Sequence, residues 1–334
     1  MAYDVIIGRN SEDKKSLGNK GLALIGKGYV KMGPYTSLSN KIYMDVAKSH
    51  IVLVAGKRGS GKSYTLGVLM EEIANLPKEV SQNIASLIFD TMGIYWTMKF
   101  KNQKDKELLD AWGTPPKNLP VKIFVPFGHF DSYIEKGIPV DERFALDITE
   151  LGTEDWILTF GLDIVDPISV LIQRTLTRLK ERGKYELSDI IAQIESDEKS
   201  SQEIKNAASS LFEAADTWGI FSKSGEESTK VSDLLTAGTS SVFDLSVYNS
   251  VGAFNVRALA ISILCKKIFN ERMNSRKKEE ISEVSKGLTY SNSDMKKETP
   301  LVWLFIDEAH EFLPKDKKTA ATDALVQLLR LLQY

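Results

Sequence analysis

The sequence predicts an α/β fold with three layers, in which a parallel β-sheet lies between layers of helices. Five short apolar runs have the composition of strands buried on both faces; they cover residues 51–55, 87–89, 121–125, 241–245 and 301–306. Segments with helical spacing of apolar residues separate several of these runs, which is typical of a sheet whose crossovers are helices. The second observation is a glycine-rich segment between the first run and the first helix, where nucleotide-binding α/β proteins carry their phosphate loop.

The first 48 residues have a different pattern, and we expect them to form a small β module. Short apolar runs at residues 4–8, 22–26 and 29–32 are broken by Gly, Asn and Ser, which is typical of short strands joined by turns. The alternative is an irregular N-terminal arm that lies on the main domain.

The core of the α/β domain is expected to comprise residues 49–148 and 236–334. Its first helix begins near Ser63 and ends before Pro77, because the apolar residues between them keep helical spacing. A long apolar helix is expected over residues 256–269. The polar stretch at 274–299 is expected to be a mobile loop, because it is poor in apolar residues.

Residues 149–235 interrupt this core and are expected to form a helical insertion packed on the sheet. Three stretches have an amphipathic pattern at helical spacing, namely residues 168–179, 187–194 and 207–215. Gly183 is expected to end the first of these helices.

The composition excludes several classes of protein. The 334 residues include 43 Lys and Arg against 45 Asp and Glu, a net charge of −2, which excludes a uniformly basic nucleic-acid wrapper but not a local basic surface. The single cysteine, Cys265, cannot form an intrachain disulfide or a Cys-based metal site. No apolar run approaches the roughly 18 residues of a membrane span, and the N-terminus lacks a signal-peptide pattern. We therefore expect a soluble, cytoplasmic protein with no membrane association.

Residues 56–63 read Gly-Lys-Arg-Gly-Ser-Gly-Lys-Ser and fit the phosphate-loop pattern G-x-x-x-x-G-K-[ST] in full. The three glycines allow the backbone to turn consecutive N–H groups toward phosphate oxygens. Lys62 is expected to reach the β and γ phosphates, and the Ser63 hydroxyl to bind Mg²⁺. A chance glycine-rich turn is the alternative, which the flanking strand and helix patterns disfavour. The residues expected to bind the nucleotide are Gly56, Lys57, Arg58, Gly59, Ser60, Gly61, Lys62, Ser63 and Tyr64.

An acidic pair, Asp307 and Glu308, directly follows the apolar run at 301–306. We expect Asp307 to hold Mg²⁺ and Glu308 to polarise a water molecule toward the γ-phosphate, which favours hydrolysis over nucleotide holding alone. A solvated strand end would contain the same residues, so this prediction depends on the phosphate loop. Together the two motifs predict an ATPase that uses ATP and Mg²⁺, with Lys62, Asp307 and Glu308 as its catalytic residues.

Two further residues are candidates for the same site. Asp90 follows the run at 87–89 and should reach the same edge of the sheet, where it either orients water or Mg²⁺ or simply ends the strand in a turn. His310 either senses the γ-phosphate or packs after the strand, and packing is favoured. His50 and His129 have no cysteine or carboxylate cluster near them in the sequence, so we expect no metal site at either.

Three segments together resemble the HerA/FtsK group of pumping ATPases, and HerA most closely. Residues 49–56 lead into the phosphate loop as in that group, residues 89–95 match its Asp-x-x-Gly-x-Tyr element, and residues 307–314 match its acidic motif. The resemblance covers nearly the whole chain and implies a RecA-like P-loop domain of the ASCE class, with the β module as an abbreviated barrel. A DEAH-box helicase is disfavoured, because it needs a shorter spacing between the two motifs and a second RecA-like domain.

The sequence departs from the family pattern in two ways. Ile94 occupies a position where family members usually carry an acidic residue. The sequence also ends soon after Asp307, before the sensor strand and the arginine finger that the resemblance implies. A buried gap beside the phosphate-loop strand would leave backbone groups unpaired, so we expect the chain to be a fragment of a longer protein and nearly inactive alone.

The resemblance implies a homo-oligomer, a hexameric ring with ATP bound between subunits, which pumps double-stranded DNA together with a NurA-like nuclease. The alternative is an ATP-dependent ring scaffold that regulates a partner effector, for example in antiviral defence, without processive DNA movement. Basic residues at 276–278, 296–297 and 315–318 are candidate DNA contacts, or else solvated loop charges. A metabolic kinase or a monomeric GTPase is disfavoured, because the sequence contains no guanine- or acceptor-recognition motif.

Overall fold

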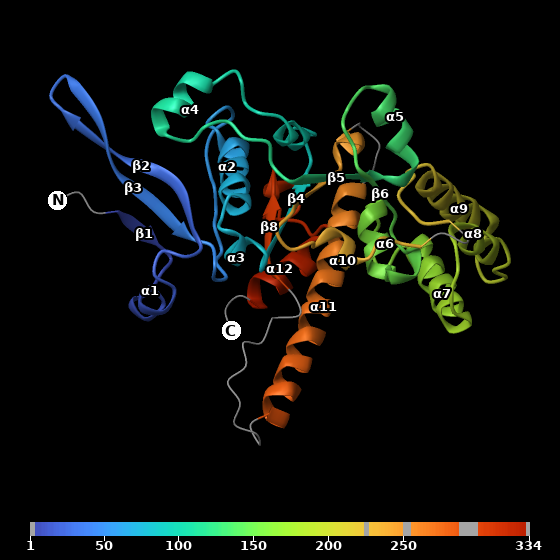
Figure 1. The fold of residues 1–334 in the computed structure, drawn as a ribbon. Helices are drawn as coiled ribbons and strands as arrows, with labels where there is room; N and C mark the ends of the chain where they lie inside the picture. The colour runs from blue at the N-terminus through green and yellow to red at the C-terminus, as the bar shows by residue number, and fades with distance from the viewer. Residues whose placement is uncertain (1–3, 224–226, 250–254, 287–299, 332–334) are drawn as a thin grey trace.

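The computed structural model describes residues 4–223, 227–249, 255–286 and 300–331, and a five-stranded sheet forms its centre (Figure 1). The strand order is β6-β5-β7-β4-β8, and every strand pair in this sheet is parallel. The strands are β4 (Ile84–Asp90), β5 (Val121–Pro126), β6 (Glu142–Phe144), β7 (Ser240–Asp244) and β8 (Leu301–Ile306). Three of the predicted strands thus have nearly the predicted bounds, β4 is longer, and β6 was not predicted.

Helices cover both faces of this sheet, and β4 shows why. All seven of its residues are buried, and consecutive side chains point to opposite faces of a sheet. Ile84 and Ile88 pack in the cluster that includes α2 (Lys62–Ala74). Leu87 and Phe89 pack in the other cluster, with the helical insertion and the helix that follows β7. The predicted three-layer α/β fold is therefore confirmed.

The predicted helical insertion is present and packs beside the sheet, on the side away from the N-terminal strands (Figure 1). It contains α6 (Thr153–Phe160), α7 (Pro167–Arg182), α8 (Leu187–Glu195), α9 (Gln202–Asp216) and the short α10 (Val231–Leu234). α7 ends at Gly183 as predicted, and this glycine has a φ of +106°. Trp156 of α6 is fully buried and contacts the rings of Phe160 and Phe212. Aromatic side chains of α6 and α9 thus pack against each other inside the insertion.

The predicted β module is also present. β1 (Val5–Ile7), β2 (Leu22–Met32) and β3 (Tyr35–Asp45) form a three-stranded sheet, with α1 (Ser11–Leu17) between β1 and β2. The antiparallel hairpin of β2 and β3 projects from the body (Figure 1). Inside the module, the buried side chains of Arg9 and Asp45 form an ion pair at 2.8 Å. The Leu24 N–H donates to Glu72 Oε2 of α2 at 2.9 Å, which attaches the module to the core.

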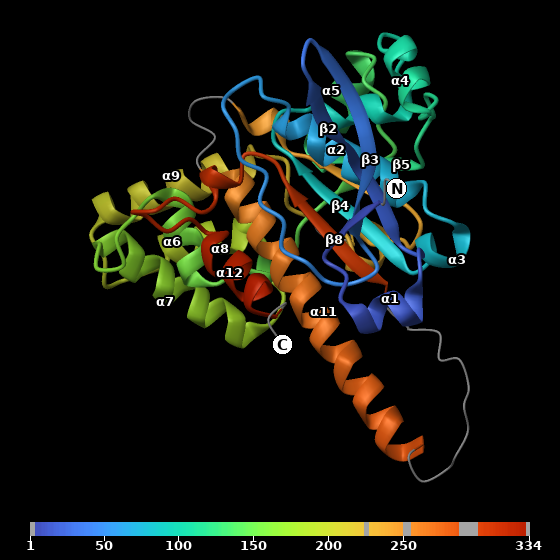
Figure 2. The ribbon, with the colours of Figure 1, turned by 90° about the vertical axis from the view of Figure 1, so that its left-hand side faces the viewer.

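The prediction of a loop at residues 274–299 is wrong for its first half, which is helical. α11 (Val256–Lys286) continues the predicted helix as far as Lys286, and its last turns extend beyond the body (Figure 2). Arg276 and Glu280 form an ion pair at 3.2 Å across one turn, which is the spacing that stabilises an exposed helix without an apolar face. Residues 287–299, including the candidate DNA contacts at 296–297, lie outside the described residues.

The remaining helices are short: α3 (Lys78–Ser81), α4 (Lys106–Trp112), α5 (Phe130–Glu135) and α12 (Thr322–Leu331). Within the four described segments of the chain, none of the helices has both the length and the apolar character that a membrane crossing requires.

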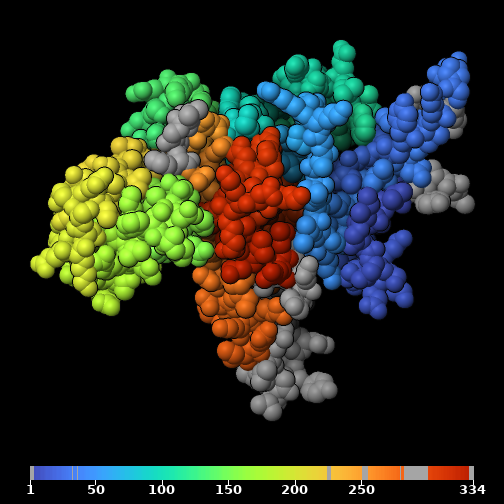
Figure 3. Space-filling model, turned by 180° about the vertical axis from the view of Figure 1, so that it is seen from behind, coloured from blue at the N-terminus to red at the C-terminus, as the bar shows by residue number. Residues whose placement is uncertain are grey.

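The prediction of a strand at residues 51–55 is wrong. These residues form no strand and are largely exposed, with Leu53 at 87% and Ile51 at 56%. They lie next to β8 and α12 on the back of the molecule (Figure 3). Among the described strands β8 pairs only with β4, so it forms the edge of the sheet. An apolar run becomes a strand only where a neighbour completes its backbone hydrogen bonds. One edge of β8 has no described partner, but residues 51–55 form no ladder with it, so their apolar pattern alone does not make them a strand.

Candidate functional site

The glycine-rich loop lies between residues 51–55 and the N-terminus of α2. Gly59 and Gly61 have φ angles of +77° and +89°, in the left-handed region that residues with a Cβ avoid. A Cβ on Gly56 would lie only 2.3 Å from the Ser60 hydroxyl oxygen. A Cβ on Gly59 or Gly61 would have no neighbouring atom within 4 Å. The loop is thus closely folded at Gly56 but open above the other two glycines, as a phosphate cradle requires.

The N-terminus of α2 supplies donors and a positive dipole end at this loop. Gly61 is the N-cap of this 13-residue helix, and no side chain caps it. The N–H groups of the first turn therefore have no side-chain acceptor and favour an anion. The Lys62 ammonium lies 3.4 Å from the carbonyl oxygen of Lys57, a long contact that a phosphate oxygen can replace. Tyr64, also predicted to bind the nucleotide, is 62% exposed on the first turn.

The structure brings the phosphate loop and the acidic pair together through Tyr95. The Tyr95 hydroxyl lies 3.0 Å from the carbonyl oxygen of Ser63 and 3.3 Å from Oδ2 of Asp307. Ser63 belongs to the first turn of α2, whereas Asp307 directly follows β8 and is buried. Two segments far apart in the sequence therefore contact a single oxygen atom.

The chemistry of these side chains suits Mg²⁺. The cation prefers oxygen ligands and usually takes one or two of them from the protein. The Ser63 hydroxyl and the Asp307 carboxylate are such ligands, and they belong to the two segments that Tyr95 connects. Ser63 and Asp307 are therefore the residues that would hold the ion.

Glu308 has an unusual backbone conformation. Its φ of +51° makes it the one non-glycine residue with a positive φ in the part of the chain that the structure describes. For such a residue this conformation costs about 1–2 kcal/mol, and strain of this kind concentrates at functional sites. His310 Nδ1 lies 3.3 Å from Glu308 Oε2, and the His310 side chain is 76% exposed. The favoured expectation that His310 packs after the strand is therefore wrong, because its ring contacts Glu308 while facing solvent.

Asp90 is fully buried and its carboxylate is occupied by the backbone. The N–H groups of residues 92–95 donate to its two oxygens over distances of 2.7–3.1 Å. The pKa of Asp90 is raised to about 6, mainly by burial and in part by the charge of Asp244, while the hydrogen bonds from the backbone N–H groups act to lower it. The Asp90 carboxylate therefore stabilises the loop after β4. Both of its oxygens already accept backbone hydrogen bonds and are not free to orient a water molecule.

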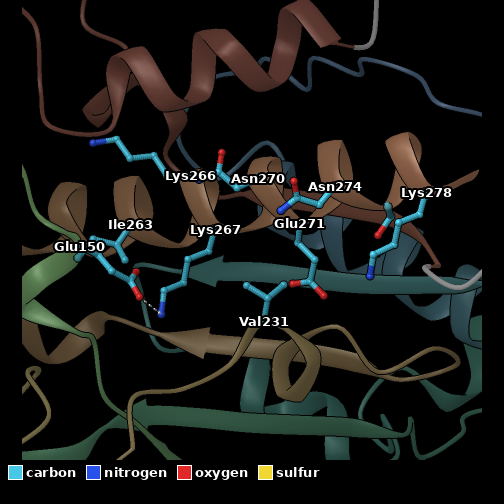
Figure 4. Close-up of a pocket in the computed structure, with 10 residues that line it drawn as sticks. Glu150, Val231, Ile263, Lys266, Lys267, Asn270, Glu271, Asn274 and Lys278 are labelled. Atoms are coloured by element: carbon cyan, nitrogen blue, oxygen red, sulfur yellow. Dashed lines mark ion pairs between the residues drawn. The ribbon is translucent and has the colours of Figure 1, made fainter. Parts of the chain in front are cut away.

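A second concave region lies apart from these residues. An open groove of about 820 Å³ runs along α11 (Figure 4). Lys266 and Lys267 line it, but Lys266 is paired with Asp155 at 2.6 Å and Lys267 with Glu150 at 2.9 Å. None of the residues that the structure places along this groove belongs to the predicted site.

A parallel α/β sheet with a phosphate loop at the start of its first core helix, and carboxylates at the end of a nearby strand, defines a P-loop nucleotide-hydrolase domain. Residues 30–268 match the protein family DUF87, described as the central domain of the helicase HerA. This match covers more than half of the chain, so the chain belongs to the HerA family and is a HerA-type P-loop ATPase. No curated protein matches the chain significantly. The family match ends before β8, so the acidic pair is assigned by the structure and the sequence pattern.

Proposed function

We propose that this ATPase is a subunit of a ring motor that moves along or unwinds double-stranded DNA. The observation that carries the proposal is the Tyr95 hydroxyl, which contacts both Ser63 of the phosphate loop and Asp307 of the acidic pair. One nucleotide can then be held by the loop and attacked from the side of the acidic pair. Membership of a family described as a helicase supports DNA as the polymer.

Within this proposal each part of the site has its own task. The backbone N–H groups of residues 56–63 and the Lys62 ammonium bind the phosphates. Ser63 and Asp307 hold Mg²⁺, which when bound neutralises charge that develops on the phosphates. Glu308 accepts a hydrogen bond from a water molecule and directs it at the γ-phosphate. The contact with His310 limits where the Glu308 carboxylate can point.

The proposed partners are further copies of the chain in a hexameric ring, double-stranded DNA, and a nuclease or other effector. Exposed basic residues support a DNA contact, since only the surfaces that face DNA need positive charge. Lys277 and Lys278 are exposed on α11, and Lys315 and Lys317 are exposed after the acidic pair. An ATP-dependent scaffold for an effector needs no such contact, which separates the two candidate functions.

The test is the rate of ATP hydrolysis by the assembled ring, with and without duplex DNA, at low and moderate salt. The motor proposal predicts stimulation by DNA, and DNA binding that weakens as salt rises. Lys315→Glu combined with Lys317→Glu should reduce the stimulation and lower the salt slope of binding by about 1 for each phosphate that the variant no longer neutralises. Lys180→Glu on α7 is the matched control and should change neither. If DNA neither stimulates hydrolysis nor binds in a salt-dependent way, the motor is contradicted and the scaffold is favoured.

A further inference from the structure

We propose that Tyr95 is a positioning residue of the nucleotide site, which holds Asp307 against the start of α2 so that Ser63 and Asp307 can share one Mg²⁺. This inference rests on the ATPase function proposed above. Tyr95 is 3% exposed and begins the 3₁₀ turn η1 (Tyr95–Lys99), in the loop that follows β4. From there its hydroxyl contacts two elements that are not its own, α2 and the end of β8.

The Tyr95 hydroxyl is suited to act as a donor to both elements. A tyrosine hydroxyl carries one hydrogen that it can donate. The Ser63 carbonyl and the Asp307 carboxylate both accept, and they share this one hydrogen. Among the described residues, the other hydrogen bond to the Asp307 carboxylate comes from the neighbouring Glu308 N–H, at 3.0 Å. Without the Tyr95 hydroxyl, the described contacts would fix Asp307 only to its own turn.

Tyr95 is itself held in place from two directions. Its backbone N–H donates to Asp90 Oδ2 at 2.9 Å, and the remaining Asp90 bonds fix the loop before it. A Cβ on Gly67 would lie 3.9 Å from the Tyr95 ring, so the ring packs on α2 at a glycine. The hydroxyl is therefore presented by a buried backbone clamp and a packed ring, which is what a positioning role requires.

The experiment measures the affinity of the whole chain for mant-labelled ATP, with Mg²⁺ and with EDTA. The Tyr95→Phe variant keeps the ring and removes only the hydroxyl oxygen. The matched control is Tyr248→Phe, because the Tyr248 hydroxyl is also buried and donates to a backbone carbonyl, that of Trp218, at 2.7 Å. Melting temperatures of the nucleotide-free variants report any general loss of stability.

The quantity compared is the factor by which Mg²⁺ raises the affinity for mant-ATP. We expect this factor to be about tenfold smaller in Tyr95→Phe than in wild type, as for the loss of a residue that orients a metal ligand. In EDTA, the affinity of Tyr95→Phe should lie within about twofold of the wild-type affinity. Tyr248→Phe should match wild type in both conditions while melting no higher than Tyr95→Phe. The inference is overturned if Tyr95→Phe keeps the wild-type Mg²⁺ dependence, or if it fails to fold while Tyr248→Phe folds. If the wild-type chain shows no Mg²⁺-dependent binding, the proposed function fails and the inference falls with it.

Discussion

Glu308 combines a left-handed backbone conformation with a carboxylate that contacts the neighbouring His310. Replacing Glu308 by Gln keeps the shape of the side chain but removes its ability to act as a base. We predict that Glu308→Gln binds nucleotide with unchanged affinity and hydrolyses it at least about 100-fold more slowly, the usual contribution of a general base. Single-turnover hydrolysis by the assembled ring, alongside nucleotide binding, checks this, and wild-type turnover would remove Glu308 from the mechanism.

Asp90 leads to a prediction about pH and stability. Its pKa rises from 3.8 to about 6 in the folded state, so the folded chain binds more protons than the unfolded chain between these values. The stability that this group contributes is therefore complete below pH 3.8 and is lost as the pH rises through 6. Asp244 acts in the same direction, since burial also raises its pKa.

We therefore predict that the free energy of unfolding falls less steeply between pH 4 and pH 6 in Asp90→Asn than in wild type. The variant will also be less stable at every pH, because the Asn amide cannot accept from all the N–H groups of residues 92–95. Urea unfolding at a series of pH values separates the two effects, since only the slope reports titration. Equal slopes for the two proteins would show that Asp90 does not titrate in this range.

Single residues also show where prediction from the sequence stops. The spacing of residues 56–63 and the position of Asp307 after an apolar run were enough to select both halves of the site. Tyr95 was noticed only as part of the Asp-x-x-Gly-x-Tyr element, with no role, because its two acceptors lie on other elements. Its contact with Asp307 spans 212 positions of the sequence, and no local pattern reports such a contact.

At the level of elements, the sequence predicts which segments are buried better than it predicts which strands pair. The strands β4, β5, β7 and β8 were predicted because apolar runs indicate buried strands. Residues 51–55 carry the same signal but pair with no described strand. β6 was missed for the opposite reason, since only one of its three residues is buried. Its place in the sheet comes from parallel pairing with β5.

α11 leads to a prediction about local stability. Its residues 256–265 are all buried apart from Arg257, which is half-buried, whereas residues 276–278 are exposed beyond the body. Exposed helical turns open with a lower free energy than packed ones, because few apolar contacts oppose their opening. Hydrogen exchange should therefore be slow at 256–268 and faster by about 100-fold or more at 276–286. Uniform protection along the helix would mean that another surface covers its end.

For the whole molecule, the parallel sheet explains why distant motifs meet. β4 and β8 are adjacent and parallel, so the residues that follow them emerge at the same edge, where α2 also begins. The sequence predicted this shared edge, because carboxyl ends of parallel strands collect at one side of a sheet. It could not predict which strand lies at the edge or how far the loop after β4 reaches, since these depend on contacts between elements.

The central claim is that the phosphate loop and the acidic pair serve one Mg²⁺ ion. A double-mutant cycle of Ser63→Ala and Asp307→Asn, read as the gain in mant-ATP affinity on adding Mg²⁺, tests it most directly. If both side chains hold the same ion, each single variant loses most of this gain and the double variant loses little more. Independent losses that multiply in the double variant would mean that the two residues do not share an ion, and the account of the site would be wrong.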